Sequence, residues 1–364
     1  MGTDIINSKK SENNTKKVLC GMSGGVDSSV SALMLQNMGF SVEGFTMQLF
    51  NKNLTDSGNT SKNDVSDAKS VCDKLNIKHR VLNYETVFKE KVINKFIESY
   101  VNGLTPNPCL YCNKNLKFGK MLNDAEALGF DYIATGHYAK IEKSGSVYYL
   151  KKATDLSKDQ SYVLYMLNQK TLSKIIFPLG NLTKKEVRKI AEENNFVNAD
   201  KGDSQDICFV PSGKYVEFIL KQGVFCKTGN YLDVTGKVIG KHKGIINYTI
   251  GQRKGLGITF GKPAFVLNKN AKTNTVTLGS EDYLFTKTVK VKDVNFTVDE
   301  KLTFPLNVTA KLRYRAEEAK AKLILGENER EYILEFAVQQ RAVTPGQAAV
   351  FYLGDVVLGG GEIY

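Results

Sequence analysis

The sequence predicts a doubly wound α/β domain with a parallel sheet, followed by a small β-rich domain and a C-terminal β-barrel. From Val18 to about Phe209, apolar strands alternate with single amphipathic helices, and such strands join through right-handed crossovers into a parallel sheet. After about residue 212, short β-rich segments with Gly, Asn and Lys turns take over. We therefore expect a disordered tail over 1–16, the α/β domain over 17–212, the central domain over 213–282 and the barrel over 283–364.

The first expected strand, Val18-Leu19-Cys20, leads into the loop Ser23-Gly24-Gly25-Val26-Asp27-Ser28. A helix leaves this loop with apolar residues on one face, at Val30, Leu33, Met34 and Met38, and Gly39 then occupies the position of a C-cap glycine. In parallel sheets, ligands bind beyond the carboxyl ends of the strands, where this loop falls. Because its glycines let backbone amides approach an anion and the helix N-terminus adds unpaired N–H groups, the loop is predicted to bind phosphate.

The later elements of the α/β domain follow in order. Strands are expected at Val42–Phe50, His79–Tyr84 and Tyr132–Ala139, and helices at Glu85–Val101, Lys114–Leu128 and Lys184–Asn194. A helix between the first two of these strands has one apolar face, formed by Val65, Ala68, Val71, Cys72 and Leu75. Thr183 and Glu186 form the capping-box pattern that opens the last helix.

Beyond the α/β domain, helical periodicity appears only briefly, at Tyr215–Leu220. A small β-rich module is predicted over Gly229–Ile258 and Pro263–Leu278, and several strands over Lys287–Tyr364. Turns within the last segment are expected at Gly326-Glu327-Asn328 and Thr344-Pro345-Gly346. Closing these strands into a barrel would remove their exposed edges.

The composition, with 42% hydrophobic residues, is that of a globular protein, and 364 residues suffice for two or three domains. No run approaches the roughly 18 apolar residues of a membrane span, and the polar N-terminus, Met1 to Lys17, lacks the apolar stretch of a signal peptide. We therefore expect a cytoplasmic protein with no membrane partner. The formal net charge of +12 favours a polyanionic partner, of which nucleic acid is the first candidate.

The loop at 23–28 lacks the G-x-x-x-x-G-K-[ST] pattern of a Walker loop, and no strand-linked G-x-G-x-x-G is present either. Its S-G-G-x-D-S pattern resembles the pyrophosphate loop of ATP pyrophosphatases, enzymes that adenylate a carbonyl oxygen and release pyrophosphate. The alternative is a glycine-rich turn that only starts a helix.

The second informative segment, Thr105 to Asn113, contains a C-x-x-C pair, Cys109 and Cys112, in what we expect to be a loop stiffened by two prolines. Cys208 lies on another expected loop. Six cysteines are too few for a disulfide scaffold, and cytosolic thiols are reduced, so the pair points to metal or redox chemistry. The other cysteines are expected to be inert or structural, namely Cys20 and Cys72 on apolar faces, and Cys226.

With these motifs in place, the chain closely resembles the tRNA-specific 2-thiouridylase family, which places sulfur at C2 of the wobble uridine of certain tRNAs. The resemblance covers nearly the whole chain after the tail. Its landmarks, in order, are GMSGGVDSSV (21–30), TPNPCLYCNKNLKFG (105–119), ATGHYA (134–139), KDQSYVLYML (158–167), DSQDICFV (203–210), YTIGQRKGLGI (248–258), LRYR (312–315) and TPGQAAVFY (344–352). It implies an N-terminal pyrophosphate-loop (HUP-type) domain, a small central domain and a C-terminal barrel that binds tRNA.

The resemblance also implies roles for particular residues. ATP would lie on Gly21, Met22, Ser23, Gly24, Gly25, Val26, Asp27 and Ser28, with Met47 and Gly136 near the adenine and ribose. Asp27 would help to hold Mg²⁺, Cys112 would be the nucleophile, and Cys208 would carry persulfide sulfur. The target base in the anticodon loop would lie between Asn107, Pro108 and Cys109, and other tRNA contacts would come from Lys158, Asp159, Gln160, Arg313, Tyr314 and Gln340. His137 follows a strand end at the predicted ATP face, which favours a phosphate contact or general base over a core histidine.

Cys109 departs from the pattern of many family members, which carry aspartate at this position. Cys109, Cys112 and Cys208 together suit a [4Fe–4S] cluster that keeps one iron open for sulfide. In the competing scheme, Cys208 carries a persulfide to the adenylated base and Cys112 resolves it. A closed zinc site with Cys226 as a fourth ligand is a third alternative, and it would leave no chemistry.

Two other functions stay open at this point. Another pyrophosphate-loop enzyme, such as an amide-forming synthetase or a tRNA lysine ligase, would not need Cys112 and Cys208. A non-catalytic RNA-binding protein would not need the intact loop at 23–28. The sequence does not identify the sulfur donor, whether a cysteine desulfurase, a relay protein or free sulfide, nor the cognate tRNAs or the oligomeric state.

Overall fold

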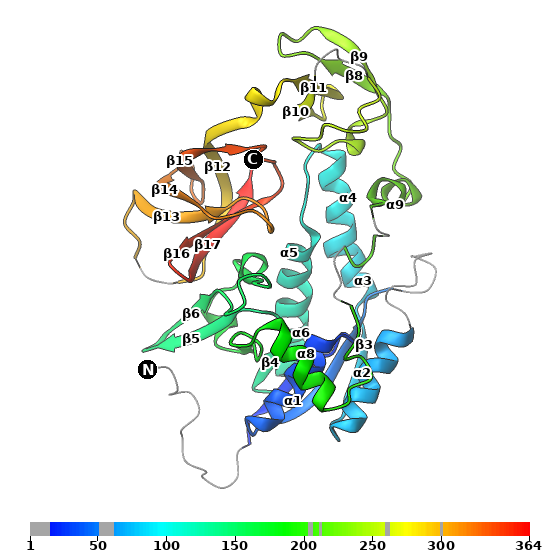
Figure 1. The fold of residues 1–364 in the computed structure, drawn as a ribbon, viewed down its shortest axis with the longest axis vertical. Helices are drawn as coiled ribbons and strands as arrows, with labels where there is room; N and C mark the ends of the chain where they lie inside the picture. Colours follow the sequence, from blue (N-terminus) through cyan, green and yellow to red (C-terminus); the bar gives the residue numbers. More distant parts are fainter. Residues whose placement is uncertain (1–14, 51–61, 203–206, 211–212, 259–262, 299–300) are drawn as a thin grey trace. The chain divides into compact units, whose positions relative to one another are not determined.

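The computed structural model describes residues 15–50, 62–202, 207–210, 213–258, 263–298 and 301–364 (Figure 1). Residues 1–14 of the expected tail over 1–16 therefore lie outside the described residues, and so do residues 203–206 of the motif at 203–210. The chain forms two compact units. The first comprises 1–87, 113–161 and 169–208, and the second comprises 88–112, 162–168 and 209–364.

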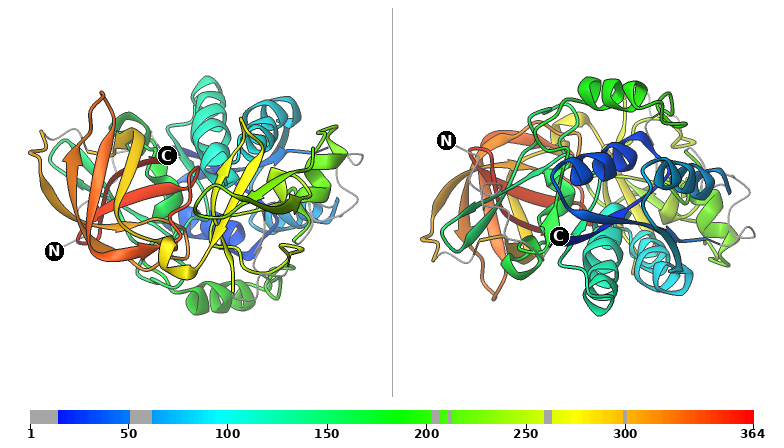
Figure 2. Two further views of the ribbon diagram at one scale, coloured as in Figure 1. Left: turned by 90° about the horizontal axis from the view of Figure 1, so that it is seen from above. Right: turned by 90° about the horizontal axis from the view of Figure 1, so that it is seen from below.

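The first unit is built on a parallel sheet with the strand order β3-β2-β1-β4-β7, which confirms the predicted doubly wound domain. The strands are β1 (Lys17–Gly21), β2 (Ser41–Gln48), β3 (His79–Asn83), β4 (Tyr132–Ala134) and β7 (Ile175–Ile176). Helices α1 (Val26–Asn37), α2 (Lys62–Lys74) and α8 (Lys184–Glu193) share one apolar core with the sheet (Figures 1 and 2). Because β1 is central, the loop that follows it opens at the carboxyl edge of the sheet, where ligands of such folds bind.

The ends of several elements differ from the prediction. The strand expected over Tyr132–Ala139 ends at Ala134, because the chain turns toward α1 at Gly136. The hairpin β5 (Lys140–Ser144) and β6 (Val147–Lys151), the short helix α7 (Gln169–Leu172) and β7 were not predicted. The capping box of Thr183 and Glu186 is confirmed, as is Gly39 (φ +87°) after the end of α1.

The predicted loop around the C-x-x-C pair is instead helical. The helix α5 (Pro108–Cys112) continues through a π-helical turn (Asn113–Lys120) into α6 (Met121–Ala127), so the helix expected from Lys114 begins six residues earlier. Proline suits the first position of a helix, where no N–H is needed, and the Asn107 side chain accepts a hydrogen bond from Cys109 N at 3.1 Å. The other expected helix is confirmed as α3 (Glu85–Phe88), a π-helical turn (Lys89–Ile93) and α4 (Asn94–Val101).

The second unit contains the central domain and the barrel. The helix α9 (Tyr215–Lys221) precedes a four-stranded sheet of order β10-β11-β8-β9, formed by β8 (Gly229–Leu232), β9 (Val238–His242), β10 (Phe265–Asn270) and β11 (Thr275–Gly279). Although sequence reasoning assigned 88–112 to the first domain, these residues group with this unit. In the part of the chain that the structure covers, no helix is both long and apolar enough to cross a membrane.

The C-terminal strands close into a barrel, as the sequence predicts. They are β12 (Phe285–Phe296), β13 (Leu306–Lys311), β14 (Ala319–Leu325), β15 (Tyr332–Arg341), β16 (Ala348–Leu353) and β17 (Val356–Ile363). The long strand β12 pairs with β15 through its first half and with β17 through its second half. The register shifts in both pairings, with the extra residues on β15 between the partners of Thr286 and Thr288, and on β12 between Lys292 and Asn295. This double pairing leaves β12 with neighbours on both sides and completes the ring.

Candidate active site

The predicted phosphate loop is a strand–loop–helix junction between β1 and α1. Gly24 has φ +75°, and a Cβ at this position would lie 2.3 Å from the backbone oxygen of Asp64, so only glycine fits. Gly25 is the N-cap of α1. The Ser28 hydroxyl accepts a hydrogen bond from Ser23 N at 3.2 Å and donates one to the Gly25 carbonyl at 2.9 Å. The loop is therefore held from within, beside first-turn amides of α1 that can bind an anion.

Gly136 lies against the first turn of α1. A Cβ there would be 3.0 Å from both Asp27 Cβ and Ser28 N, so the segment after β4 reaches the loop at backbone distance. Met47 is half-buried near the carboxyl end of β2, the strand beside β1. Both residues thus lie at the carboxyl edge of the sheet, and their contacts with the adenine and ribose stay a prediction.

Asp27 is the centre of a charged network that sequence reasoning missed. Lys184 Nζ donates hydrogen bonds to both carboxylate oxygens of Asp27, at 2.7 and 2.8 Å, and the Tyr138 hydroxyl donates to one of them at 2.8 Å. The Lys184 side chain is only 11% exposed and that of Asp27 is 33% exposed. Lys184 is the first residue of α8, directly after the N-cap Thr183. The capping box was the only sequence signal near Lys184. A capping box indicates where a helix starts but not what the lysine side chain contacts.

A second missed pair supports the loop through the carbonyl of Gly24. Asn198 Nδ2 donates to the Gly24 carbonyl at 3.0 Å and to Ser29 Oγ at 2.9 Å. Lys201 Nζ also donates to the Gly24 carbonyl, at 3.1 Å. Lys201 also pairs with two α2 carboxylates, Asp64 at 2.6 Å and Asp67 at 2.9 Å. Burial lowers the pKa of the Lys201 ammonium, but the hydrogen bonds with the two carboxylates outweigh it and raise the pKa overall. The lysine therefore stays charged and joins α2 to the loop.

His137 lies inside the first unit, with 6% of its surface exposed and the rings of Phe118 and Phe177 beside it. Nδ1 is 2.7 Å from Thr135 Oγ1, and Nε2 is 3.5 Å from Lys117 Nζ. Because an ammonium can only donate, Nε2 accepts and the ring proton is assigned to Nδ1. Burial, assisted by the Lys117 charge, holds the pKa of His137 well below its ordinary value. Both nitrogens are thus engaged within the protein, a geometry that suits a neutral core histidine better than the favoured site role.

Because His137 is neutral in the folded chain, we expect the free energy of unfolding to fall in acid. Its pKa in the folded chain lies below the ordinary 6.5, so below pH 6.5 the unfolded chain takes up a proton that the folded chain does not. The contribution of His137 to the free energy of unfolding should therefore fall by up to about 1.4 kcal/mol per pH unit as the pH drops from 6.5 toward the folded pKa. Urea unfolding of the unmodified protein and His137→Gln between pH 7.5 and 5 measures this difference. Equal pH slopes for the two proteins would contradict the assignment.

The predicted reactive cysteines lie in different surroundings from the core ones. Cys109 is exposed and Cys112 half-buried, one turn apart on α5 in the second unit, and Cys208 is exposed in a turn of the first unit. Among the residues described, no group of three or more Cys, His, Asp or Glu side chains is arranged to hold a metal ion. The prediction of inert thiols is confirmed for two residues. Burial raises the pKa of Cys20, and it raises that of Cys72 to about 11.

Comparison with known proteins identifies the family. Residues 16–212 match the family described as tRNA methyl transferase HUP domain, 217–280 match its PRC-barrel domain, and 286–363 match the aminomethyltransferase β-barrel domain. The protein named tRNA-specific 2-thiouridylase MnmA of Clostridium beijerinckii is 48% identical over 96% of this chain and 98% of its own. The chain belongs to the tRNA-specific 2-thiouridylase family. A relative of the same name from Treponema denticola is also 48% identical, over 95% of this chain and 97% of its own.

In this 2-thiouridylase family member, two of the residues expected to contact tRNA have partners inside the first unit. Asp159 is buried and accepts hydrogen bonds from Ala153 N and Ser161 Oγ, at 3.0 and 2.7 Å. Gln160 Oε1 accepts from Tyr138 N at 3.0 Å, and Gln160 N donates to the Tyr138 carbonyl. Gln160 thus positions the tyrosine that binds Asp27. Contact of this segment with tRNA, including Lys158, stays a prediction.

The expected tRNA contacts on the barrel also have structural roles. The Arg313 guanidinium donates to the Ala342 carbonyl and to Thr344 Oγ1, the latter at 2.7 Å, and so fixes the turn before β16. Tyr314 is partly exposed beside the Tyr162 ring. Gln340 bonds to the carbonyl of Val338 at 2.8 Å, near one end of β15. Tyr314 and Gln340 thus keep surface that a ligand can reach.

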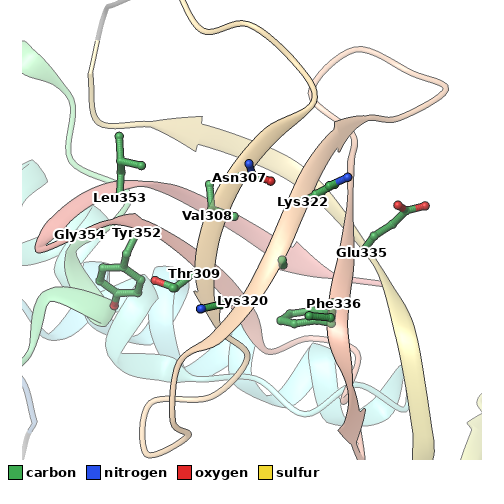
Figure 3. A pocket seen from close by; sticks show the side chains of 12 residues that line it. Asn307, Val308, Thr309, Lys320, Lys322, Glu335, Phe336, Tyr352, Leu353 and Gly354 are labelled. Carbon is green, nitrogen blue, oxygen red and sulfur yellow. The ribbon is translucent and has the colours of Figure 1, made fainter.

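A pocket of about 560 Å³ lies on the barrel, over β13, β14 and β15 (Figure 3). Its lining combines two lysines, Lys320 and Lys322, with Thr309, Phe336 and Tyr352. No residue to which the 2-thiouridylase resemblance assigns a role lines it, although Tyr352 ends one of the landmark segments.

Proposed function

We propose that this protein uses ATP to replace the C2 oxygen of the wobble uridine of tRNA with sulfur. The observation that carries the proposal is the geometry of the loop at 23–28 in a chain of this family, in which Gly24 lies at backbone distance from Asp64 and Gly25 caps the start of α1. The ATP-binding domain is proposed to span 17–212, the central domain 213–282 and the barrel 283–364.

The first step activates the base. The C2 oxygen of uracil is a poor leaving group and must first be adenylated. It attacks the α-phosphorus of ATP, an O–P bond forms, and pyrophosphate leaves. The loop amides stabilise the phosphate charge where it develops. The Asp27 carboxylate, in the first turn of α1, is of the ligand type that Mg²⁺ prefers, and bound Mg²⁺ would neutralise phosphate charge there.

The second step delivers sulfur. The terminal sulfur of a Cys208 persulfide bonds to C2, and AMP leaves with the former carbonyl oxygen. The Cys112 thiolate then attacks the Cys208 sulfur, the bond to the transferred sulfur breaks, and a Cys112–Cys208 disulfide forms. Two routes then restore the persulfide. An external dithiol reduces the disulfide and a desulfurase-type donor transfers the outer sulfur of its own persulfide to the Cys208 thiolate, or sulfide attacks the Cys208 sulfur of the disulfide itself, which forms the Cys208 persulfide and frees the Cys112 thiolate. Both thiols are accessible enough for this role, since Cys208 is exposed and Cys112 is half-buried.

A [4Fe–4S] cluster on Cys109, Cys112 and Cys208 is the alternative sulfur carrier. Three thiolates with one open iron suit sulfide transfer, and a cluster held by these cysteines would deliver sulfide to the activated base. Iron and acid-labile sulfide in anaerobically purified protein decide between the schemes, because stoichiometric amounts of both would favour the cluster and their absence the persulfide.

The tRNA must present its wobble base outside the anticodon stack, at a cost of about a few kcal/mol. The net charge of +12 favours electrostatic binding of the tRNA phosphate backbone, which would offset this cost. Such binding weakens as the salt concentration rises. The proposed base contacts are Asn107, Pro108 and Cys109, and the proposed outer contacts are Lys158, Asp159, Gln160, Arg313, Tyr314 and Gln340.

The experiment that tests the proposal is nucleoside mass spectrometry on unmodified tRNA after incubation with anaerobically purified protein, ATP, Mg²⁺, a dithiol reductant and a cysteine desulfurase with cysteine as the persulfide donor. Formation of 2-thiouridine supports the proposal. Release of pyrophosphate without a thiolated base would leave adenylation in place and overturn the proposed sulfur step. No tRNA-stimulated pyrophosphate release at all would favour a non-catalytic RNA-binding protein.

A further inference from the structure

Lys184 and Asp27 form an ion pair at the place where the phosphates of a nucleotide would bind. Lys184 Nζ lies within 2.8 Å of both Asp27 oxygens, and the lysine side chain is 11% exposed. A buried ammonium needs an anionic partner, since removing the partner of a buried charge is strongly destabilising. Before nucleotide binds, Asp27 supplies this partner. The pair therefore neutralises two groups that would each interact with phosphate or metal on their own.

Binding of Mg²⁺ and ATP changes the partners available to both groups. Asp27 is the second residue of α1, next to the amides that would hold phosphate, and a bare carboxylate there repels a polyphosphate. If Mg²⁺ takes the carboxylate, the Lys184–Asp27 ion pair breaks at the moment when new phosphate oxygens arrive beside the ammonium. A lysine suits such an exchange, because its ammonium is a point charge on a flexible stem.

The backbone of Lys184 and the carboxylate of Asp27 are each held by contacts that do not depend on their ion pair. The backbone of Lys184 is fixed by the Thr183–Glu186 capping box and by a hydrogen bond from Lys184 N to Asp155 Oδ2 at 3.0 Å. Asp27 keeps the hydrogen bond from the Tyr138 hydroxyl at 2.8 Å, and Gln160 fixes Tyr138 in turn. The carboxylate therefore stays in place when the ammonium leaves.

We propose that Lys184 is an exchangeable counter-ion, which neutralises Asp27 before ATP binds and transfers to the β- and γ-phosphates when Mg²⁺ takes the carboxylate. This inference rests on the proposed use of ATP and does not depend on the sulfur step. It adds a specific consequence. Lys184 discriminates between ATP and AMP, because only ATP has the phosphates to which the ammonium moves.

The test is calorimetric titration of ATP and AMP, with Mg²⁺ and with a chelator, into the full-length protein and three variants. Lys184→Met keeps the stem and removes the charge, and Asp27→Asn removes the anion. Lys185→Met is the matched control, since Lys185 is the next residue of α8 and is exposed. Circular dichroism and thermal unfolding confirm that each variant folds. Lys184→Met should weaken binding of Mg²⁺–ATP by about 10- to 100-fold and leave AMP affinity within about twofold.

In the absence of Mg²⁺, Asp27→Asn should strengthen the binding of ATP rather than weaken it. The ion pair with Lys184 and one negative charge are then gone, so metal-free ATP should bind more tightly than to the unmodified protein, whereas the gain from Mg²⁺ should shrink. Equal weakening of ATP and AMP by Lys184→Met would overturn the inference, because it would show that the lysine only shapes the loop. Unchanged metal-free ATP affinity in Asp27→Asn would overturn it as well. Failure of the unmodified protein to bind ATP would instead refute the proposed function, and this inference with it.

Discussion

Replacing Cys208 with serine is expected to reduce 2-thiouridine formation by more than about a thousandfold while tRNA-stimulated release of pyrophosphate continues. A serine hydroxyl cannot form a persulfide, so the proposed sulfur carrier is lost, whereas the proposed ATP site on β1 and α1 is untouched. Cys208 is exposed in a turn, so the substitution removes no core packing. Thiolated nucleoside and pyrophosphate measured in the same reaction separate the two half-reactions.

Cys112→Ser should show the same separation, because the transferred sulfur then cannot be released from Cys208. Cys226→Ser is the matched control. Cys226 is half-buried and its sulfur accepts a weak hydrogen bond from Asn247 at 3.8 Å, which a serine oxygen can replace. It should keep nearly full activity. Thiolation that survives in Cys208→Ser would contradict the persulfide scheme and favour direct use of sulfide.

The parts of the fold that depend on neighbouring residues were predictable. The loop at 23–28, the glycine after α1 and the capping box of α8 each follow from a few adjacent residues, and all three are observed. The parallel sheet followed from the alternation of strands and helices. Closure of the barrel followed from the exposed edges that several short strands would otherwise leave. The double pairing of β12 did not, because pairing partners are set by contacts distant in sequence.

The candidate site was predictable only in part, for the same reason. Lys184 is 157 residues from Asp27 in the chain, and Lys201 is 177 residues from Gly24, so no local pattern connects them. His137 illustrates the converse. Its position after a strand end suggested a ligand contact, whereas its two ring nitrogens are engaged by Thr135 and Lys117. Local signals thus placed the loop, and long-range packing determined which side chains surround it.

Gly24→Ala should reduce ATP-dependent release of pyrophosphate by about a hundredfold or more. Gly24 has φ +75°, which alone costs an alanine about 1–2 kcal/mol. A Cβ would also stand 2.3 Å from the Asp64 carbonyl oxygen and 2.7 Å from Asp64 Cα, both backbone atoms that cannot rotate away. The loop must shift, and displacement of binding groups by about 1 Å can cost a hundredfold in rate. Steady-state release of pyrophosphate at varied ATP measures the effect.

Gly39→Ala separates the two contributions. Gly39 has φ +87°, similar to Gly24, but no atom lies within 4 Å of its Cβ position. Both variants should therefore lose a similar amount of stability from backbone strain, while only Gly24→Ala also moves the loop away from Asp64 and from the donors Asn198 and Lys201. If both variants lowered ATP turnover equally, the loss would reflect general destabilisation. A loss confined to Gly24→Ala would show that the close approach of α2 to the loop shapes the phosphate site.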